Sequence, residues 1–398
     1  MKIIYITNGM GLHSKAISDA FYKILGNDFV FLDIRKPNET HSAIHKEAEE
    51  GMDYNNIEYI FHAMQNGETQ KKAWEIVNDA DIAICSGNSW NYIRHRLSQS
   101  KITFYISERW LKKPKYLISP LGWYSLLKSV VRYQSPCFYH LALGAYCAND
   151  AAFLHIFRNK MFKFAYLVPI EQYDVKKSLI NRRKEVVEIL WCSRFIDWKH
   201  PELVTNLAKR LVNSGYLNFH ITMIGSRTPI QDMEKNFIEK NELGQYVTIV
   251  SGMPNYKVRS MMKESNIFLL TSDHEEGWGV VLNEAMGAGC AVVASSQSGA
   301  TPFLIKQGVN GMIFKSGSLD SLDSKVKNLL DDCVLREKIA ESAYYSISET
   351  WGADVVAGRF IELCKGLIEG NKGLYNEGPC SLALPCDENN VLADLSDQ

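Results

Sequence analysis

The chain has 398 residues, a length that predicts two or three domains rather than one. Hydrophobic residues make up 46% of the sequence and charged residues 22%, which is typical of a soluble globular protein with enough apolar material for two cores. The formal net charge of -1 argues against nucleic acid as the main partner.

The nine cysteines are scattered along the chain, and no pair has CxxC spacing. The sequence therefore indicates neither a disulfide framework nor a zinc site, and a reducing cytosolic compartment fits best. The first residues lack the apolar core of a signal peptide, and no run approaches the roughly 18 apolar residues that a membrane span needs. We expect a cytoplasmic protein, at most peripheral at the inner face of a membrane.

Short apolar runs alternate with longer helical patterns along the chain. In the first half we predict a helix over residues 14–25 and strands over 3–7, 29–34, 81–87 and 102–107. The rhythm restarts near residue 185, with strands predicted over 186–193, 219–226, 247–252, 267–272 and 291–295. This alternation is the pattern of parallel α/β units. The predicted fold class is α/β, with two Rossmann-like, doubly wound domains.

Composition indicates where the domains end. The first domain is predicted over residues 1–174 and the second over 185–349, with the charged stretch VKKSLINRRK at 175–184 as a linker. Residues 371–398 lack periodicity and are rich in polar and acidic residues, so we predict a disordered tail. Open α/β sheets bind ligands at the carboxyl ends of their strands, so two such domains facing each other would leave a cleft lined by β-to-α loops.

The stretch EEGWGVVLNEAMGAGC, residues 275–290, carries the strongest chemical signal. Glu276 falls in a predicted loop after a strand, and Glu284 falls in the helix that follows. Gly277 and Gly279 let the backbone approach a ligand at a helix N-terminus, where free N–H groups favour phosphate. Nearby acids can accept hydrogen bonds from sugar hydroxyls, so the group suits a nucleoside diphosphate linked to a sugar. Glycines at a purely structural turn are the alternative that spacing alone leaves open.

This stretch, together with SGATPFLIKQGVNGMIF at 298–314, resembles the donor-binding core of retaining glycosyltransferases of the GT-B fold, the family 4 or group 1 set. The family pattern is a Glu, seven residues and a second Glu within E-G-aromatic-G…E-A-M-A-x-G. The resemblance covers roughly residues 186–367 well and the first half only in its rhythm. It implies an N-terminal acceptor-side domain, a C-terminal nucleotide-sugar-binding domain and a helix at 350–370 that crosses back to the first domain.

Carried onto this chain, the resemblance implies a role for each residue of the motif. Glu276 would contact the hydroxyls of the donor sugar and support the reacting centre. Glu284 would bind the ribose. The backbone of Gly277, Trp278 and Gly279 would contact the sugar and the diphosphate.

Upstream, WCSRFIDWKHPEL matches the family's strand with an Arg and, five residues on, a Lys. Arg194 and Lys199 would hold the diphosphate and stabilise its charge as it leaves, which agrees with the preference of phosphate for an arginine fork and a lysine point charge. A surface salt bridge is the alternative for either residue taken singly. Gly252 and Met253, at the end of the predicted strand 247–252, are further candidate donor-binding residues.

Two positions depart from the family pattern. The family often has Gly-Gly-x-Pro-Glu after the last predicted strand, whereas this chain reads SGATPF, with Phe303 where the acid is expected. His200 replaces the small residue that commonly follows the lysine. The sequence therefore leaves that part of the sugar or acceptor pocket undefined.

In many relatives the first glycine-rich loop approaches the donor phosphate, and Gly9 and Gly11 are the candidates here. His13 opens the helix that follows and is a candidate residue on the acceptor side. A plain tight turn is the alternative reading of this loop. Because the loop lacks the full GxGxxG, it argues against an NAD-dependent dehydrogenase.

Further acceptor-side candidates follow a middle strand of the first domain. Glu108 and Arg109 stand where many relatives have a histidine, and Glu108 could orient the acceptor or act only as a helix-start acid. Tyr146 lies in LALGAYCANDAAF, which resembles the interdomain loop and helix of the family. Asp150, in the same stretch, could be only an acid at a helix N-terminus.

Residues 94–163 interleave basic and aromatic side chains. The set comprises Lys112, Lys113, Lys115, Lys128, Arg132, Lys160, Lys163, Trp110, Trp123, Tyr124 and Tyr133. Such a mixture suits a lipid headgroup surface or an anionic lipid-diphosphate acceptor. A solvated basic face over an aromatic core explains the pattern equally well.

The sequence therefore predicts a retaining glycosyltransferase, of hexosyltransferase type, acting in polysaccharide, lipopolysaccharide or other glycoconjugate biosynthesis. The expected donor is a UDP-sugar or GDP-sugar, and the expected acceptor is a hydroxyl of a saccharide or lipid-linked saccharide. No cofactor and no metal are expected, because the acid pair in Asp79-Ala80-Asp81 precedes a strand, at the wrong end for a cleft ligand. A nucleotide-sugar epimerase or hydrolase on the same fold, and a non-catalytic sugar-nucleotide-binding module, remain alternatives.

Overall fold

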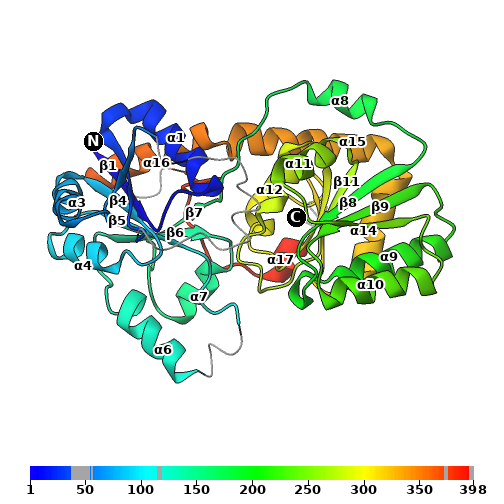
Figure 1. Cartoon of the computed structure of the whole chain (residues 1–398), viewed down its shortest axis with the longest axis horizontal. Helices are drawn as coiled ribbons and strands as arrows, with labels where there is room; N and C mark the ends of the chain where they lie inside the picture. Colours follow the sequence, from blue (N-terminus) through cyan, green and yellow to red (C-terminus); the bar gives the residue numbers. More distant parts are fainter. Residues whose placement is uncertain (37–53, 55–56, 114–118, 372–374, 394–398) are drawn as a thin grey trace. The chain divides into compact units, whose positions relative to one another are not determined.

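The computed structural model describes residues 1–36, 54, 57–113, 119–371 and 375–393. The chain divides into two compact units (Figure 1). The first contains Met1–Pro169 and Trp351–Pro385, and the second contains Ile170–Thr350 and a C-terminal segment that begins at Cys386.

The first unit is built on a seven-stranded sheet in the order β3-β2-β1-β4-β5-β6-β7, with parallel pairing throughout. Its strands are β1 (Ile3–Thr7), β2 (Phe29–Asp33), β3 (Ile60–His62), β4 (Ile82–Cys85), β5 (Thr103–Ser107), β6 (Phe138–Leu143) and β7 (Met161–Phe164). Its helices include α1 (Leu12–Leu25), α3 (Gly67–Asp79), α4 (Trp90–Ser98), α6 (Pro120–Leu126), α7 (Cys147–Phe153) and α16 (Ala353–Ile368).

The second unit is built on a six-stranded parallel sheet in the order β10-β9-β8-β11-β12-β13, the 3-2-1-4-5-6 order of a Rossmann fold. Its strands are β8 (Val187–Cys192), β9 (Phe219–Gly225), β10 (Val247–Ser251), β11 (Ile267–Leu270), β12 (Ala291–Ser295) and β13 (Met312–Phe314). Its helices include α8 (Val175–Asn181), α9 (Pro201–Asn213), α10 (Pro229–Lys240), α11 (Asn255–Glu264), α12 (Val280–Gly287), α13 (Thr301–Leu304), α14 (Leu319–Asp331), α15 (Cys333–Tyr345) and α17 (Glu388–Leu392).

The core of the second unit explains why its sequence reads as continuous apolar runs. β11 and β12 are buried along their whole length, as central parallel strands are when helices cover both faces of the sheet. α9, α10 and α14 lie on one face and α8, α11, α12 and α15 on the other (Figure 1). α9 begins at Pro201, which suits a first helical position. It buries Leu203, Leu207 and Leu211 at helical spacing.

Residues 175–184 differ from the predicted linker. Val175–Asn181 form α8, whose Val175 and Leu179 are buried in the core of the second unit. The guanidinium of Arg182 is also buried and donates hydrogen bonds to the carbonyl oxygens of Ser265, Ala288 and Gly289 at 3.1, 2.8 and 2.7 Å. The high charge of this stretch therefore reflects a helix with one apolar face and a structural arginine.

The C-terminal residues also differ from the predicted disordered tail. The N–H groups of Cys380 and Ala383 donate to the carbonyl oxygens of Lys163 and Met161, both at 2.9 Å, so the segment pairs with β7. Leu382 forms an antiparallel bridge with Phe162. The tail thus covers the edge of the first sheet, a pairing that polar composition does not reveal. Residues 372–374 and 394–398 of the predicted tail lie outside the described residues.

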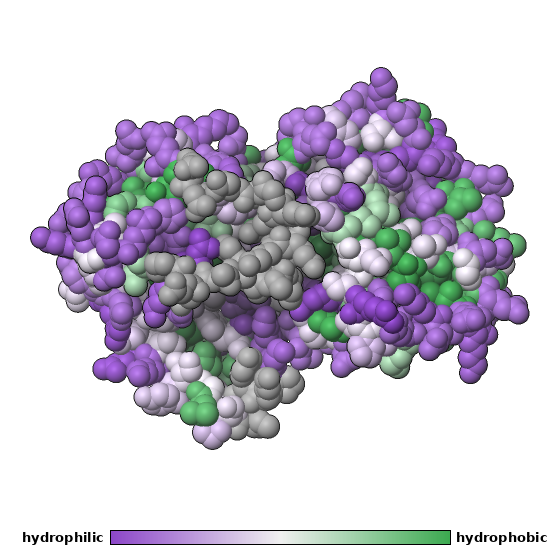
Figure 2. All heavy atoms as spheres, viewed as in Figure 1, coloured by the Kyte–Doolittle hydropathy of each residue, from purple (hydrophilic) through white to green (hydrophobic). Residues whose placement is uncertain are grey.

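Residues from Trp351 onward return to the first unit. There the ring of Phe360 on α16 packs against Phe21 of α1 and Phe104 of β5, with ring centroids 5.5 and 4.9 Å apart. In the described part of the chain, no helix combines the length and apolar character needed to cross a membrane. The visible surface is mainly hydrophilic, with apolar patches that include one where α6 lies (Figure 2).

Candidate functional site

The second sheet reverses its strand order between β8 and β11, which are neighbours in register, with Leu190 opposite Phe268. From β8 the chain continues to β9 on one side, and from β11 it continues to β12 on the other. The loops that leave these two strands therefore diverge, which creates a crevice at the carboxyl edge of the sheet. The first loop carries Arg194 and Lys199, and the second carries Glu276.

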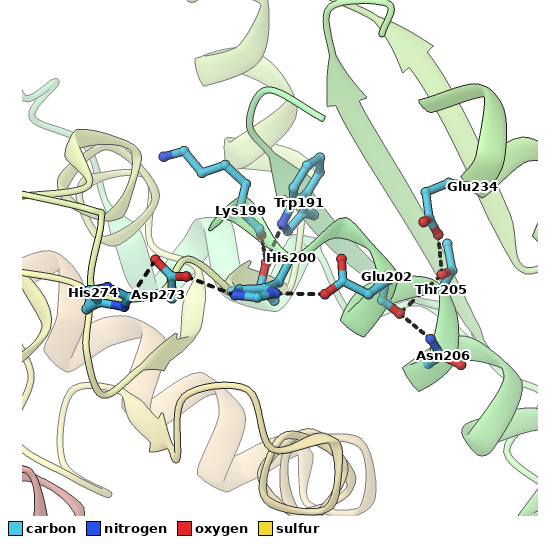
Figure 3. A network of polar contacts seen from close by, with 10 residues as sticks. Trp191, Lys199, His200, Glu202, Thr205, Asn206, Glu234, Asp273 and His274 are labelled. Atoms are coloured by element: carbon cyan, nitrogen blue, oxygen red, sulfur yellow. Dashed lines mark hydrogen bonds and ion pairs between the residues drawn. The ribbon is translucent and has the colours of Figure 1, made fainter. Parts of the chain in front are cut away.

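Lys199 and Glu276 form an ion pair across this point. Their side chains are only 10% and 11% exposed, so each charge depends on the other for compensation. The backbone behind the lysine is fixed, because its carbonyl oxygen accepts a hydrogen bond of 2.6 Å from the Thr271 hydroxyl. That hydroxyl in turn accepts a bond of 2.8 Å from the indole N–H of Trp191 (Figure 3).

Arg194 and Lys199 gather around a single aromatic side chain. The Lys199 ammonium lies 4.1 Å, and the Arg194 guanidinium 5.5 Å, from the ring centroid of Trp198. Arg194 is exposed, whereas Lys199 is buried. The indole face attracts both cations and keeps two positive charges together at the edge of the crevice, where an anionic ligand would meet them.

The turn before α12 has room only for glycine. Gly279 has a φ of +94°, and a Cβ there would lie 2.9 Å from Ser298 Oγ. A Cβ on Gly299 would lie 1.9 Å from the carbonyl oxygen of Gly277, because the loop after β12 packs directly on this turn. The Gly299 N–H also donates to the Glu276 carbonyl oxygen at 3.1 Å. Two loops therefore fix the backbone beside Glu276.

Trp278 turns its side chain into the core, where it is 1% exposed. Its indole N–H donates to Asn283 Oδ1 at 2.8 Å, and its ring packs edge-on against Phe303 at 6.3 Å. Only the backbone of Trp278 is left for a ligand, as the resemblance implies. Phe303 stands where an acid was expected because it packs against this buried indole.

Glu284 lies on α12 and is 3% exposed. Burial raises the pKa of its carboxyl group, and the hydrogen bond from Asn255 and the charge of Arg259 partly oppose that rise. The Asn255 side-chain amide donates to Glu284 Oε1 at 2.8 Å. Asn255 begins α11 and was not singled out in the sequence. An Asn three positions after a strand-ending glycine is too common a pattern to identify it.

Gly252 and Met253 lie in the loop that joins β10 to α11, with Gly252 exposed and Met253 half-buried. A Cβ on Gly252 would lie 3.3 Å from Ser226 Oγ. The loop leads into the helix whose first residue reaches Glu284. It therefore reaches the predicted ribose-binding acid through Asn255.

The glycines of the first unit lie at the switch point of the first sheet. Gly9 follows β1 with a φ of +97°, and a Cβ there would lie 3.1 Å from the Arg35 guanidinium carbon. Gly11 is the N-cap of α1 and has an extended backbone. The ring of His13 packs against Tyr166 with centroids 5.3 Å apart. The structure describes these residues within the first unit alone.

Three of the other first-unit candidates lie together. The Arg109 guanidinium donates to Asp150 Oδ1 at 2.8 Å and lies 5.7 Å from the ring centroid of Tyr146. Asp150 is 3% exposed and also accepts from the Leu111 N–H at 2.7 Å. Glu108 instead pairs with Lys112 at 2.8 Å, in a loop where no helix begins. The reading of Glu108 as a helix-start acid is therefore wrong.

Within the described residues, no group of three or more His, Cys, Asp or Glu side chains is arranged to hold a metal ion. The Asp79 and Asp81 carboxylates both bind Lys2, through its ammonium at 2.6 Å and its backbone N–H at 2.8 Å. They lie at the amino end of the first sheet, as expected. Metal independence stays a prediction.

A family comparison agrees with the position of this site. Residues 174–345 match the family described as glycosyl transferases group 1. These residues lie in the second unit and contain every candidate described between Arg194 and Glu284.

Curated relatives match the same half of the chain. The alpha-D-kanosaminyltransferase of Streptomyces kanamyceticus is 30% identical over 220 residues, 51% of this chain and 55% of the relative. The lipopolysaccharide 1,2-N-acetylglucosaminetransferase of Salmonella typhimurium is 24% identical over 203 residues, 49% and 52%. The sulfoquinovosyl transferase of Arabidopsis thaliana is 24% identical over 206 residues, 51% and 38%. The chain thus spans about half the length of the curated relatives it matches, or less.

Solved structures resemble almost the whole chain. Anabaena HepE in complex with UDP is 16% identical, with a TM-score of 0.65, over 93% of this chain and 100% of that one. Sucrose-phosphate synthase from Thermosynechococcus elongatus is 12% identical, with a TM-score of 0.64, over the same shares. The fold is GT-B. At these identities the likeness shows the fold, and both Rossmann-like sheets of a GT-B protein are present in the described residues.

Proposed function

We propose that this GT-B protein is a glycosyltransferase that moves a sugar from a nucleotide-diphosphate-sugar to a hydroxyl acceptor, with retention of anomeric configuration. The observation that carries the proposal is the Lys199–Glu276 pair at the switch point of the second sheet, beside Arg194. The group 1 match over residues 174–345 and the sugar-transferase names of the relatives support it. We take UDP as the first probe, because a structure of the same fold holds UDP.

The geometry assigns each residue a task in this reaction. The diphosphate, once bound, competes with Glu276 for the Lys199 ammonium, and Arg194 adds a second cation. Both cations stabilise the charge that develops on the leaving phosphate. Glu276, freed from its ion pair, accepts hydrogen bonds from the sugar hydroxyls. Glu284 and Asn255 hold the ribose.

The transfer balances without an enzyme nucleophile. The bond from the anomeric carbon to the β-phosphate oxygen breaks, and its electron pair leaves with the nucleoside diphosphate. The acceptor oxygen bonds to the anomeric carbon on the same face. The acceptor proton passes to the departing phosphate oxygen. We further propose that no metal is needed, since Lys199 and Arg194 supply the positive charge.

The acceptor is proposed to be a saccharide or a lipid-linked saccharide, and the first unit offers a surface for it. α6 and the π-helical turn Leu127–Val131 expose Leu121, Tyr124 and Leu127 by 80%, 59% and 53%. The Lys128 ammonium lies 5.5 Å from the Tyr124 ring centroid. Apolar side chains beside a cation suit peripheral contact with anionic lipid.

Other basic residues of the 94–163 region have structural tasks. Lys112 pairs with Glu108, and the Lys160 ammonium donates to the Ser135 carbonyl oxygen at 2.6 Å. Lys115 lies outside the described residues. Co-sedimentation with phosphatidylcholine vesicles, with and without phosphatidylglycerol, tests the membrane contact. Binding to the anionic vesicles that Leu121→Ser does not reduce would remove α6 as the contact.

The experiment for the reaction incubates the protein with UDP-sugars and GDP-sugars, with and without saccharide acceptors, with EDTA present. The proposal predicts acceptor-dependent release of the nucleoside diphosphate and a glycoside whose anomeric proton coupling in NMR matches that of the donor. An inverted product would overturn retention. Free sugar or an isomer released from the donor alone would indicate a hydrolase or epimerase. Turnover that requires added metal would overturn metal independence.

A further inference from the structure

His200, directly after Lys199, has an unusual backbone for its residue type. Its φ is +50° and its ψ +55°, in the left-handed region, and it precedes Pro201 at the start of α9. A branched side chain is strained in that region, and a following proline disfavours helical backbone. Such strain persists only where surrounding contacts impose it. The contacts of the ring show what does so.

Both ring nitrogens of His200 face carboxylates (Figure 3). Nδ1 lies 2.7 Å from Glu202 Oε1, in the first turn of α9. Nε2 lies 3.3 Å from Asp273 Oδ2, in the loop after β11. Ionised carboxylates only accept hydrogen bonds, and a neutral imidazole donates from one nitrogen alone. The ring therefore satisfies both partners as the imidazolium.

Asp273 connects this ring to the candidate site. Its backbone N–H donates to the Trp198 carbonyl oxygen at 3.0 Å, and its own carbonyl oxygen accepts from the Glu276 N–H at 3.1 Å. Its Oδ1 accepts from the Glu275 N–H at 2.8 Å. The His200–Asp273 contact thus joins the loop that carries Lys199 to the loop that carries Glu276.

We propose that His200 is a positioning residue, whose protonated ring bridges Glu202 and Asp273 and holds the Lys199 loop against the Glu276 loop, so that loss of the proton weakens nucleoside diphosphate binding. The proposal rests on the proposed function of the Lys199–Glu276 pair. The Lys199 side chain itself points away from the ring (Figure 3).

The charged groups around His200 give the direction of the pH dependence. Glu202 and Asp273 face the ring, and on the far side of Asp273 lies His274, with Nδ1 3.8 Å from Oδ1. The hydrogen bond to Glu202 raises the pKa of His200, burial partly opposes it, and Asp273 raises it further. A raised folded-state pKa means that the bridge stabilises fully below the ordinary histidine pKa. It is lost as pH rises through the higher folded value.

The test measures UDP binding by calorimetry from about pH 6 to about pH 9, for the wild type, His200→Gln and a control, His220→Gln. His220 lies in the same unit, 3.5 Å from Glu188, and faces neither loop. UDP itself titrates near this range, so the readout is the difference between each variant and the wild type. Wild-type affinity should exceed that of His200→Gln by about fivefold or more at the low end, and converge with it at the high end. A constant ratio across pH would overturn the proposal.

A second measurement keeps the inference separate from the proposed function. The ring titration of His200 is followed by NMR in histidine-labelled protein and assigned by its loss in His200→Gln. Unfolding of His200→Gln, Asp273→Asn and the double variant gives their coupling. A raised pKa and a coupling present only at low pH support the bridge even if UDP fails to bind. An ordinary pKa or no coupling overturns it.

Discussion

Lys199 and Glu276 are each about one-tenth exposed (10% and 11%), and their loops leave neighbouring strands. An ion pair in such a place contributes little net stability, because desolvation of both charges offsets their attraction. Its value lies in being exchangeable. A diphosphate can replace Glu276 as the partner of Lys199 without leaving a buried charge alone, which couples anion binding to release of the glutamate.

Removing one member of this pair should destabilise the protein far more than removing both. Lys199→Ala leaves the Glu276 carboxylate uncompensated and should lower the free energy of unfolding by about 3 kcal/mol, as should Glu276→Ala. The double variant should be closer to the wild type than either single one. Urea unfolding of the four proteins measures the coupling. Additive effects would show that the pair is not formed.

Glu284→Gln should separate stability from binding. Because burial raises the pKa of Glu284, the folded state holds its proton at a pH where the unfolded state has released it. Stability is therefore lost as pH rises from the ordinary carboxyl pKa through the folded value. Glu284→Gln should remove that loss, so its stability equals or exceeds that of the wild type near neutral pH.

The same variant should bind UDP about tenfold or more weakly, since a charged hydrogen-bond acceptor is lost. Calorimetry and urea unfolding at several pH values check both effects. Glu239→Gln, at an exposed position on α10, is the control. A Glu284→Gln protein that is less stable near neutral pH would contradict the buried, raised-pKa assignment.

At the scale of elements, the site depends on two loops that pack without side chains between them. Gly299 of the loop after β12 presses against the Gly277 carbonyl, and this contact sets the backbone at the start of α12. The loop cannot move outward, because the Gly299 and Ala300 N–H groups donate to the carbonyl oxygens of Glu276 and Trp278 at 3.1 and 2.9 Å. The position of Glu276 is thus a property of both loops.

Gly299→Ala should therefore reduce both stability and UDP binding. The added methyl would lie 1.9 Å from the Gly277 carbonyl oxygen, so the backbone must shift, at a cost of about 1–3 kcal/mol. Gly244→Ala, where a Cβ meets nothing within 4 Å, should change stability by less than about 0.5 kcal/mol. Thermal unfolding and calorimetry compare the two variants. Equal effects would show that the two loops are not in tight contact.

The sequence predicted the elements whose signal is local. β8, β11 and β12 appear as uninterrupted apolar runs, and the two acids, Arg194 and Lys199 carry a spacing that can be recognised. α8 was misread because its charges mask two buried positions four residues apart. The role of Asp273 depends on contacts from another loop, and spacing along the chain does not contain that information.

At the scale of the whole molecule, the C-terminal segment completes the first sheet. Residues 380–383 pair with β7, and the following α17 belongs to the second unit, where Glu388 accepts a 3.0 Å hydrogen bond from the Gln297 side chain. An open parallel edge invites pairing with other chains. The segment therefore protects β7 even though its composition resembles a disordered tail.

Truncation after Asn371 should expose the β7 edge. We expect a lower unfolding temperature and concentration-dependent aggregation, whereas truncation after Ala393 should leave both unchanged. Scanning calorimetry and light scattering on the two proteins measure these effects. If both truncations behave like the full chain, the pairing with β7 does not stabilise the protein.

The central claim is that the loops after β8 and β11 form a nucleoside-diphosphate site, and calorimetric titration of UDP and GDP tests it most directly. The proteins are the wild type, Lys199→Ala and Lys209→Ala, which removes a lysine on α9 that lies over Phe237. We predict that the wild type and Lys209→Ala bind one of the two nucleotides equally, and that Lys199→Ala loses most of that affinity. Equal binding by all three proteins, or no binding by the wild type, would contradict the account.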